Sequence, residues 1–281
     1  MKHVVSFSGG RTSAYLVNLM EQKRKAQGLD VAYVYMDTGA EHPKTYDFIR
    51  NVVKHFGIEL ICLRVEINPE LGKANSYRVV SLNDIGPDLQ PWRDMMSKYG
   101  TPYFGGAFCT DRMKLVPFTK YCQERFGEWD TWLGIRADEP RRLKPKKGIR
   151  YLAEISDFEK QDVVSWWGEQ SFDLDLDEWS GNCVFCFKKS DLKIAAAQRD
   201  NPAEYIEFLS ALNGDSVRTG EKTGSISSMY RKKRSLERVV GMFDGSTGEE
   251  IKARIRGAKM TDSGSCSESC EVFNCQIDMF D

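Results

Sequence analysis

The residues near the start of the chain that are best suited to chemistry form one short polar turn. Residues 6–13 are Ser-Phe-Ser-Gly-Gly-Arg-Thr-Ser, and they follow the apolar run 3–5. Glycines lack a Cβ, so the backbone can approach an anion closely, while helix-start N–H groups, hydroxyls and an Arg can bind it. The pattern predicts a phosphate-binding turn, although an ordinary tight turn is the alternative. Its candidate ligands are Ser6, Ser8, Gly9, Gly10, Arg11, Thr12 and Ser13.

Cysteines supply the second candidate chemistry. The chain has eight of them, and its first residues do not resemble a secretory signal, which favours metal or redox chemistry over a disulfide framework. Cys183 and Cys186 form a Cys-x-x-Cys pair, which leaves zinc, an iron–sulfur cluster and a redox dithiol open. Cys62 and Cys122 lie in apolar segments and are predicted to be buried. The others lie in polar or glycine-rich surroundings: Cys109, Cys183, Cys186, Cys266, Cys270 and Cys275.

Strands and helices must bring these residues together. The runs 3–5, 30–36 and 59–65 each predict a strand, and they are separated by helical patterns that begin at residue 14 and at Pro43. This alternation predicts parallel strands, and ligands bind at the carboxyl ends of the strands in such sheets. The residues that follow the second strand are therefore expected on the same rim as the turn; they are Asp37, Thr38 and Gly39.

The next segments add candidates at the same rim. Residues 68–106 predict a long excursion with one short helix around 92–98, and a helix is predicted to start at Thr110 or Asp111. Residues 131–135 predict a fourth strand. Gly134 lies near its end, and Arg136 follows it directly. An Arg at a strand end can bind a phosphate through two parallel hydrogen bonds.

The composition of the chain changes after residue 190. Two helices are predicted at 195–198 and 201–212, followed by a mobile loop over 214–228 that is rich in Gly, Ser, Thr and Lys. The last residues form a tail with three cysteines. We therefore expect an α/β domain over residues 1–190 and a helical appendage with a cysteine-containing tail over residues 191–281.

Charge limits the partners of the chain. The net charge of -1 gives no general attraction to polyanions, so contacts with nucleic acid would depend on local clusters. Two clusters exist, Arg141–Arg150 and Arg231–Arg234, and solvated loops are the alternative interpretation. No apolar run approaches the roughly 20 residues that a membrane helix needs. We expect a cytoplasmic protein without membrane contact.

Four motifs resemble, in their order and spacing, the PP-loop ATP pyrophosphatase (adenine nucleotide alpha-hydrolase) superfamily in its phosphoadenylyl-sulfate (PAPS) reductase-like branch. They are the turn at 6–13, Asp37-Thr38-Gly39 with Pro43 and Thr45, the run from Cys109 to Pro117, and Gly134 to Arg142. The resemblance covers roughly residues 1–190 and implies a Rossmann-like α/β fold with a parallel sheet. Thr12 and Pro140 depart from the family's usual Asp and Ser.

The resemblance also implies ligands. An adenine nucleotide, either ATP or a sulfonucleotide, would bind at the turn, at residues 37–39 and at Gly134 and Arg136, with Mg2+ as a further candidate. Lys114 and Arg136 would stabilise charge in the reaction. Cys109, Cys183 and Cys186 would hold a 4Fe-4S cluster, and the fourth ligand would be Cys270, with Cys266, Cys275 or an open iron as alternatives.

Three functions remain open from the sequence. In the favoured one, ATP adenylates an acceptor and sulfur delivered through the cluster replaces the adenylated group; the acceptor is predicted to be a nucleic acid, and the sulfur or electron donor is not identified. The second is a sulfonucleotide reductase, which needs a nucleophilic Cys on the tail. The third is a non-catalytic nucleotide-sensing or DNA-binding regulator in which Thr12 marks a disabled turn.

Overall fold

A computed structural model describes residues 1–102, 108–219, 230–231 and 234–257. Its centre is a sheet with the strand order β4-β3-β2-β1-β5-β6. Neighbouring strands are parallel except β3 and β4, which are antiparallel. The predicted α/β fold with a Rossmann-like, mostly parallel sheet is therefore confirmed. The strands are β1 (Lys2–Phe7), β2 (Val31–Asp37), β3 (Leu60–Glu66), β4 (Ser76–Val80), β5 (Trp129–Leu133) and β6 (Ile149–Tyr151).

Helices connect most successive strands, and further helices come after the last strand in the sequence. Gly28 and Gly57 end the first two of them in the left-handed conformation, with φ of 68° and 66°. The helices are α1 (Arg11–Gln27), α2 (Pro43–Phe56), α3 (Gln90–Tyr99), the π-helix η1 (Cys109–Leu115), α4 (Val116–Phe126), the short η2 (Pro140–Arg142) and η3 (Leu152–Glu154), α5 (Lys160–Gly168), α6 (Asp191–Asp200), α7 (Pro202–Leu212), α8 (Leu236–Gly241) and α9 (Gly248–Gly257). None of the described helices has the length and apolar run needed to cross a bilayer.

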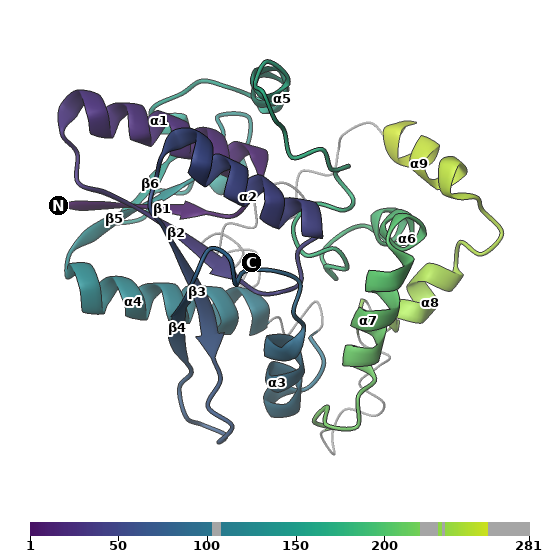
Figure 1. Cartoon of the computed structure of the whole chain (residues 1–281). Helices are drawn as coiled ribbons and strands as arrows, with labels where there is room; N and C mark the ends of the chain where they lie inside the picture. Colours follow the sequence, from purple (N-terminus) through teal and green to yellow (C-terminus); the bar gives the residue numbers. More distant parts are fainter. Residues whose placement is uncertain (103–107, 220–229, 232–233, 258–281) are drawn as a thin grey trace.

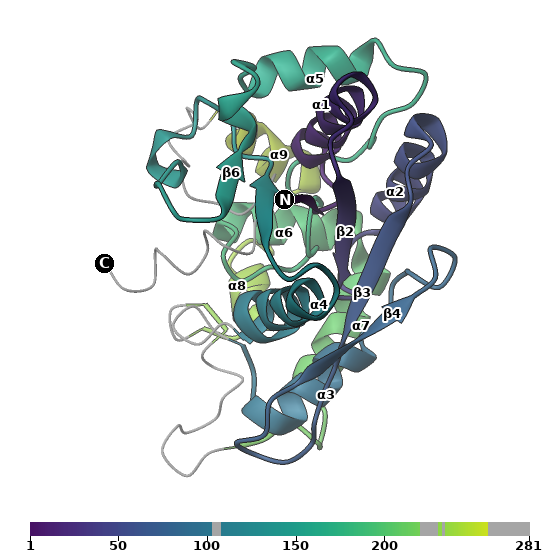
Figure 2. The same cartoon turned by 90° about the vertical axis from the view of Figure 1, so that its left-hand side faces the viewer.

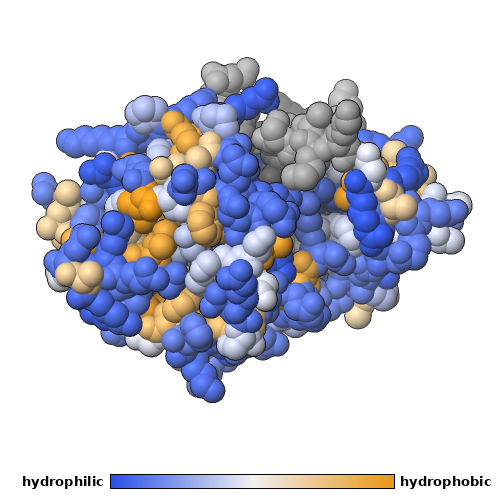
Figure 3. Space-filling view, turned by 90° about the horizontal axis from the view of Figure 1, so that it is seen from above, coloured by the Kyte–Doolittle hydropathy of each residue, from blue (hydrophilic) through white to orange (hydrophobic). Residues whose placement is uncertain are grey.

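The two faces of the sheet are buried by different helices. Val5 and Phe7 pack with α1, α2 and α5 on one face, whereas Val4 packs with α4 on the other, as the two-residue period of a strand requires. Figure 2 shows α4 across the sheet from α1 and α5. Seen from the α5 side, the surface is predominantly hydrophilic, with hydrophobic side chains scattered among polar ones (Figure 3).

The C-terminal helices pack into a group of their own beside the sheet. Figure 1 shows α6 to α9 grouped beyond the carboxyl ends of the strands. Their apolar side chains share one core with α3 and with the Cys183–Phe187 segment, so Phe208 and Ile194 lie in the same cluster as Trp92 and Val184. The division into 1–190 and 191–281 stays a prediction, because this core contains residues from both sides of it.

Some elements differ from those expected. The short strands β4 and β6 were not predicted, because β4 is a five-residue edge strand within the irregular segment 68–106 and β6 has three residues within a basic segment. Helix η1 has π rather than α geometry, and α8 and α9 were missed. Residues 220–228 of the predicted loop lie outside the described residues, as does the cysteine-containing tail.

Candidate functional site

The predicted phosphate turn joins β1 to α1. Gly9 has a φ of 81°, and a Cβ there would lie 2.9 Å from Cγ2 of Thr45, so this position requires glycine. Gly10 caps α1 without a side-chain hydrogen bond. The first N–H groups of the helix have no intrahelical acceptors, and they are the donors that an anion needs.

A pocket, here called the turn pocket, opens at this helix start. The predicted ligands Gly9, Gly10, Arg11 and Thr12 line it, together with Thr45, Lys160, Val163, Val164, Leu174, Leu176, Asp177, Glu178, Gly181 and Asn182. The hydroxyl of Thr45 is buried and has no hydrogen-bond partner among the described residues, so the pocket wall offers an unused polar atom. Ser8 and Ser13 are not among the lining residues, and their hydroxyl oxygens lie 2.9 Å apart. Ser6 is buried within β1.

Arg11 and Arg136 each form an ion pair with a carboxylate of the chain. Arg11 donates to Asp173 through Nε (2.7 Å) and Nη2 (2.8 Å). Arg136, which follows Gly134 at the end of β5, donates to Asp138 (2.8 and 3.2 Å). Its Nη1 also donates to the hydroxyl of Thr12 (3.2 Å), so Arg136 reaches the first turn of α1. The residue that replaces the family's usual Asp thus contacts a predicted phosphate-binding Arg.

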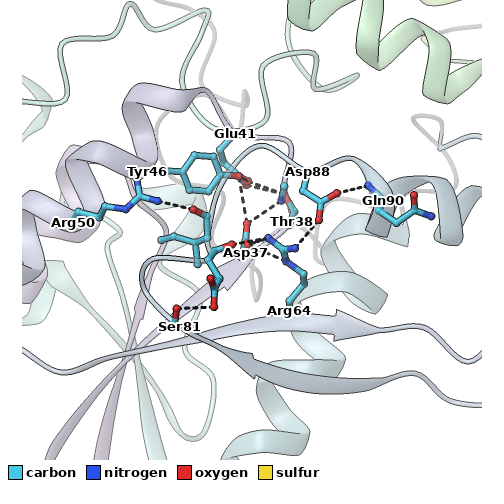
Figure 4. A network of polar contacts seen from close by, with 12 residues as sticks. Asp37, Thr38, Glu41, Tyr46, Arg50, Arg64, Ser81, Asp88 and Gln90 are labelled. Carbon is cyan, nitrogen blue, oxygen red and sulfur yellow. Dashed lines mark hydrogen bonds and ion pairs between the residues drawn. The ribbon is translucent and has the colours of Figure 1, made fainter.

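The loop after β2 is held by a buried polar network (Figure 4). Asp37 accepts hydrogen bonds from Arg64, from the N–H of Gly39 (3.0 Å) and from the hydroxyl of Tyr46 (3.3 Å). Arg64 also donates to Asp88 (2.7 Å). Burial, and next the nearby Glu41 carboxylate, raise the pKa of Asp37 to about 6. Asp37 is therefore an ion-pair partner of Arg64 and is not among the residues that line the turn pocket.

Glu41 is a site residue that sequence reasoning missed. Its buried carboxylate accepts hydrogen bonds from Thr38 (2.9 Å) and Tyr46 (3.1 Å). It also lies 3.8 Å from Nζ of Lys114 and 3.8 Å from Sγ of Cys183. Its position two residues after Gly39 could have indicated a site residue. Its burial and its contacts with residues far away in the sequence depend on the fold.

A second pocket, here called the cysteine pocket, brings together the three predicted ligands Cys109, Cys183 and Cys186. They come from two segments more than 70 residues apart in the sequence. The other lining residues are mostly aromatic or cationic: Trp92, Thr110, Lys114, Asn182, Phe185, Phe187, Lys188, Phe208 and Tyr230.

Backbone contacts position the Cys-x-x-Cys segment. Cys183 forms a β-bridge with Glu41, and the N–H of Val184 donates to the carbonyl of Ala40 (3.1 Å). The fully buried Lys189 donates through Nζ to the carbonyls of Trp179 (2.6 Å) and Val184 (2.9 Å). This segment is therefore fastened to the loop after β2.

The π-helix η1 places Cys109 and Lys114 at the same pocket. In a π-helix the hydrogen bonds run from residue i to i+5, so residues five positions apart lie close to one another on one face. The α-helix expected from the sequence would have turned the two side chains well apart. The π geometry of η1 thus allows both Cys109 and Lys114 to line the cysteine pocket.

The fit of the described residues to a metal ion is limited by their arrangement. Among the described residues, no three His, Cys, Asp or Glu side chains are arranged to hold one. Cys270, the predicted fourth ligand, and its alternatives Cys266 and Cys275 lie outside the described residues.

The two pockets adjoin at one residue. Asn182 lines both of them, and its φ of 54° places a non-glycine residue in the left-handed region. Asn tolerates this conformation, and such backbone positions cluster at functional sites. The two pockets therefore share this part of their walls.

The predicted basic clusters are partly engaged within the chain. Arg142 pairs with Glu139, and Arg150 pairs with Glu154 (3.0 Å). Arg231 and Arg234 both pair with Asp191. Lys232 and Lys233 lie outside the described residues.

Comparisons with known proteins agree with this fold. The family model described as "Phosphoadenosine phosphosulfate reductase domain" matches residues 2–161. An uncharacterized nin region protein of Escherichia phage lambda is 55% identical over 283 aligned residues, covering 99% of this chain and 97% of its own. An uncharacterized protein of Methanocaldococcus jannaschii is 32% identical over 148 residues, covering 52% of this chain and 25% of its own.

Proposed function

The chain belongs to the phosphoadenosine phosphosulfate reductase family within the PP-loop superfamily, and from this premise we propose that it couples an adenine nucleotide to sulfur chemistry. The nucleotide occupies the turn pocket, and the sulfur chemistry takes place at the cysteine pocket. The observation that carries the proposal is the junction at Asn182, which lines both pockets. A reacting group on the nucleotide would then be within reach of the thiols without a large movement.

The favoured reaction has two balanced steps. An acceptor oxygen attacks the α-phosphorus of ATP and pyrophosphate leaves, which yields an adenylated acceptor. Sulfide from the sulfur donor then attacks the acceptor carbon that bears the adenylated oxygen, so that a C–S bond forms, the C–O bond breaks and AMP leaves with that oxygen. The first N–H groups of α1, together with Arg136 and Lys114, would stabilise the negative charge that develops on the phosphates.

Thiolates are ligands of both zinc and iron–sulfur clusters, and the cysteine pocket brings three predicted ligands to one lining. Cys109, Cys183 and Cys186 would hold the proposed iron–sulfur cluster, with Cys270 proposed as the fourth ligand. When bound, the cluster would supply iron able to bind sulfur beside the nucleotide.

Anaerobic purification followed by iron, sulfide and zinc counts tests the cluster. We expect about four irons and four sulfides per chain, lost in Cys109→Ala, Cys183→Ala and Cys186→Ala. The Cys62→Ala variant is the matched control, because Cys62 is buried in the sheet core away from the pocket. Stoichiometric zinc without sulfide would contradict the cluster.

Nucleotide binding has its own test. Gly10→Asp adds a carboxylate at the helix start, where it would repel phosphate, so this variant should lose ATP binding in a fluorescent-nucleotide titration. The wild-type protein should release AMP and pyrophosphate from ATP when acceptor and sulfide are present. ATP binding without any turnover would favour a nucleotide-sensing regulator.

A sulfonucleotide reductase is the second candidate, and the family match favours it. In that reaction a thiolate attacks the sulfur of the nucleotide's sulfate group, and a second thiol then reduces the S-sulfonate and releases sulfite. Sulfite release from PAPS with a thiol donor, and no AMP release from ATP, would replace the adenylation proposal with this one.

We retain nucleic acid as the proposed acceptor, through the exposed lysines Lys144, Lys146 and Lys147 in the Arg141–Arg150 segment. Each phosphate contact steepens the salt dependence of binding by about 0.7 to 0.9 log units per log unit of salt. Replacing the three lysines with Ser should flatten the slope, whereas Lys54→Ser on α2 should not. An absence of salt-dependent binding in the wild-type protein would exclude this acceptor.

A further inference from the structure

Two buried hydrogen-bond donors in the cysteine pocket have no acceptor among the described residues. They are Nε1 of Trp92 and the hydroxyl of Tyr230. Their side chains are 3% and 1% exposed. Buried polar groups of folded proteins are nearly always paired, so two unpaired donors in one pocket wall need an explanation.

The two donors come from distant parts of the chain. Trp92 belongs to α3, and Tyr230 lies between α7 and α8. Phe208 of α7 contacts both of them, with ring centroids 5.6 Å and 6.4 Å away. Packing of this kind fixes the two side chains, so they are not free to turn toward solvent.

The rest of the lining has the same character. The pocket lining includes the cationic side chains Lys114 and Lys188. The buried Glu41 carboxylate lies behind them, 3.8 Å from Nζ of Lys114 and 3.8 Å from Sγ of Cys183. A pocket with donors, cations and thiols fits an anionic, sulfur-rich group.

We propose that Trp92 Nε1 and the Tyr230 hydroxyl donate hydrogen bonds to the sulfurs of the group held by Cys109, Cys183 and Cys186, and that they are positioning residues for it. This inference rests on the proposed cluster site. Hydrogen bonds to the sulfurs of a cluster stabilise its more negative, reduced state and raise its reduction potential. The two residues would thus set the potential without being ligands.

Redox titration followed by EPR tests the inference on the anaerobically loaded full chain. Trp92→Phe and Tyr230→Phe each remove one donor, and each should lower the midpoint potential. We expect about a tenfold weaker preference for the reduced state per donor, which corresponds to about 59 mV for one electron. Tyr35→Phe is the matched control, because its buried hydroxyl also has no described partner but lies in the core of the sheet.

Urea unfolding of the metal-free and the loaded protein gives a second readout. Without the group, Tyr230→Phe removes an unpaired buried hydroxyl and should leave the unfolding midpoint unchanged or raised. With the group, the same change should lower the midpoint. A purely structural role of the hydroxyl would lower it equally in both forms, which would overturn the inference.

The outcomes separate this inference from the proposed function. Loaded protein whose potential is the same in wild type, Trp92→Phe and Tyr230→Phe overturns the inference and leaves the cluster in place. Wild-type protein that binds no iron and sulfide overturns both. If Tyr230→Phe does not fold, Trp92→Phe decides the question alone.

Discussion

At the scale of single residues, two buried carboxylates organise the loop after β2. Asp37 and Glu41 both accept a hydrogen bond from Tyr46, and Arg64 compensates the charge of Asp37. Glu41 in turn lies beside Lys114 and Cys183. The loop after β2 therefore reaches the wall of the cysteine pocket through buried side chains.

The raised pKa of Asp37 predicts a pH dependence of stability. Between the ordinary pKa of 3.8 and about 6 the folded protein holds a proton that the unfolded chain has released. The contribution of Asp37 to the free energy of unfolding therefore falls as pH rises through this window and is constant above it. Urea unfolding of wild type and Asp37→Asn from pH 4 to pH 7 measures it. The prediction would be contradicted if the free energy of unfolding of the wild type rose with pH relative to that of Asp37→Asn.

Gly39 shows how closely that loop is packed. A Cβ at this position would lie 1.9 Å from the carbonyl oxygen of Asp88, and its φ is 76°. Gly39→Ala should destabilise the protein by several kcal/mol, roughly 3 or more, because both the backbone and the Asp88 loop must move. Gly57→Ala is the control, since its φ is 66° but nothing lies near its Cβ. That control should cost only about 1 kcal/mol in urea unfolding. Equal losses in the two variants would refute the packing argument.

At the scale of elements, three helices outside the sheet help to build the cysteine pocket around the non-helical segment 182–188. Helix η1 carries Cys109 and Lys114, α3 carries Trp92, and α7 carries Phe208. Phe208 packs edge-on against Trp92 and lies near Phe185, with centroids 5.6 Å and 5.8 Å away. The appendage thus supports residues that precede it in the chain.

Removing that support should open the pocket. Phe208→Ala should destabilise the protein by about 3–5 kcal/mol, the usual cost of deleting a buried aromatic ring. Ile206→Ala, two positions away on the same helix and at a side chain that is 66% exposed, should change stability by less than about 0.5 kcal/mol. Thermal or urea unfolding compares the two, and a small effect of Phe208→Ala would mean that α7 contributes little to the pocket.

At the scale of the whole molecule, the chain has a core that spans the expected domain boundary. Ile194, Phe208 and Leu236 on one side of residue 190 are buried with Trp92 and Phe185 on the other. A boundary with so many apolar contacts across it differs from a linker, where few contacts cross.

A chain cut after residue 190 should therefore not fold by itself. Truncation would expose the apolar side chains of α3 and the Cys183–Phe187 segment, which lose their cover. We expect aggregation or a loose state without cooperative unfolding, measured by gel filtration and circular dichroism beside the full chain. A monomeric fragment with a sharp unfolding transition would show instead that residues 1–190 are an independent domain.

Local patterns in the sequence determined the parallel sheet and its connecting helices. Alternating apolar runs and glycine stops such as Gly28 and Gly57 depend on neighbours within one element, so they can be recognised without the fold. The turn at Gly9 and Gly10 was recognisable for the same reason. The short β4 was not, because its five residues lie in the irregular segment 68–106 and are too few to show a clear period.

Only the tertiary structure decided which residues meet. The contact of Glu41 with Cys183 joins positions 142 residues apart, and the pairing of Arg136 with Thr12 joins positions 124 apart. Trp92 and Tyr230 share a pocket with the cysteines only because α3, α7 and the Cys-x-x-Cys segment bury one another. Burial and long-range proximity are properties of packing and not of local spacing, so the two adjoining pockets could not be derived from the sequence.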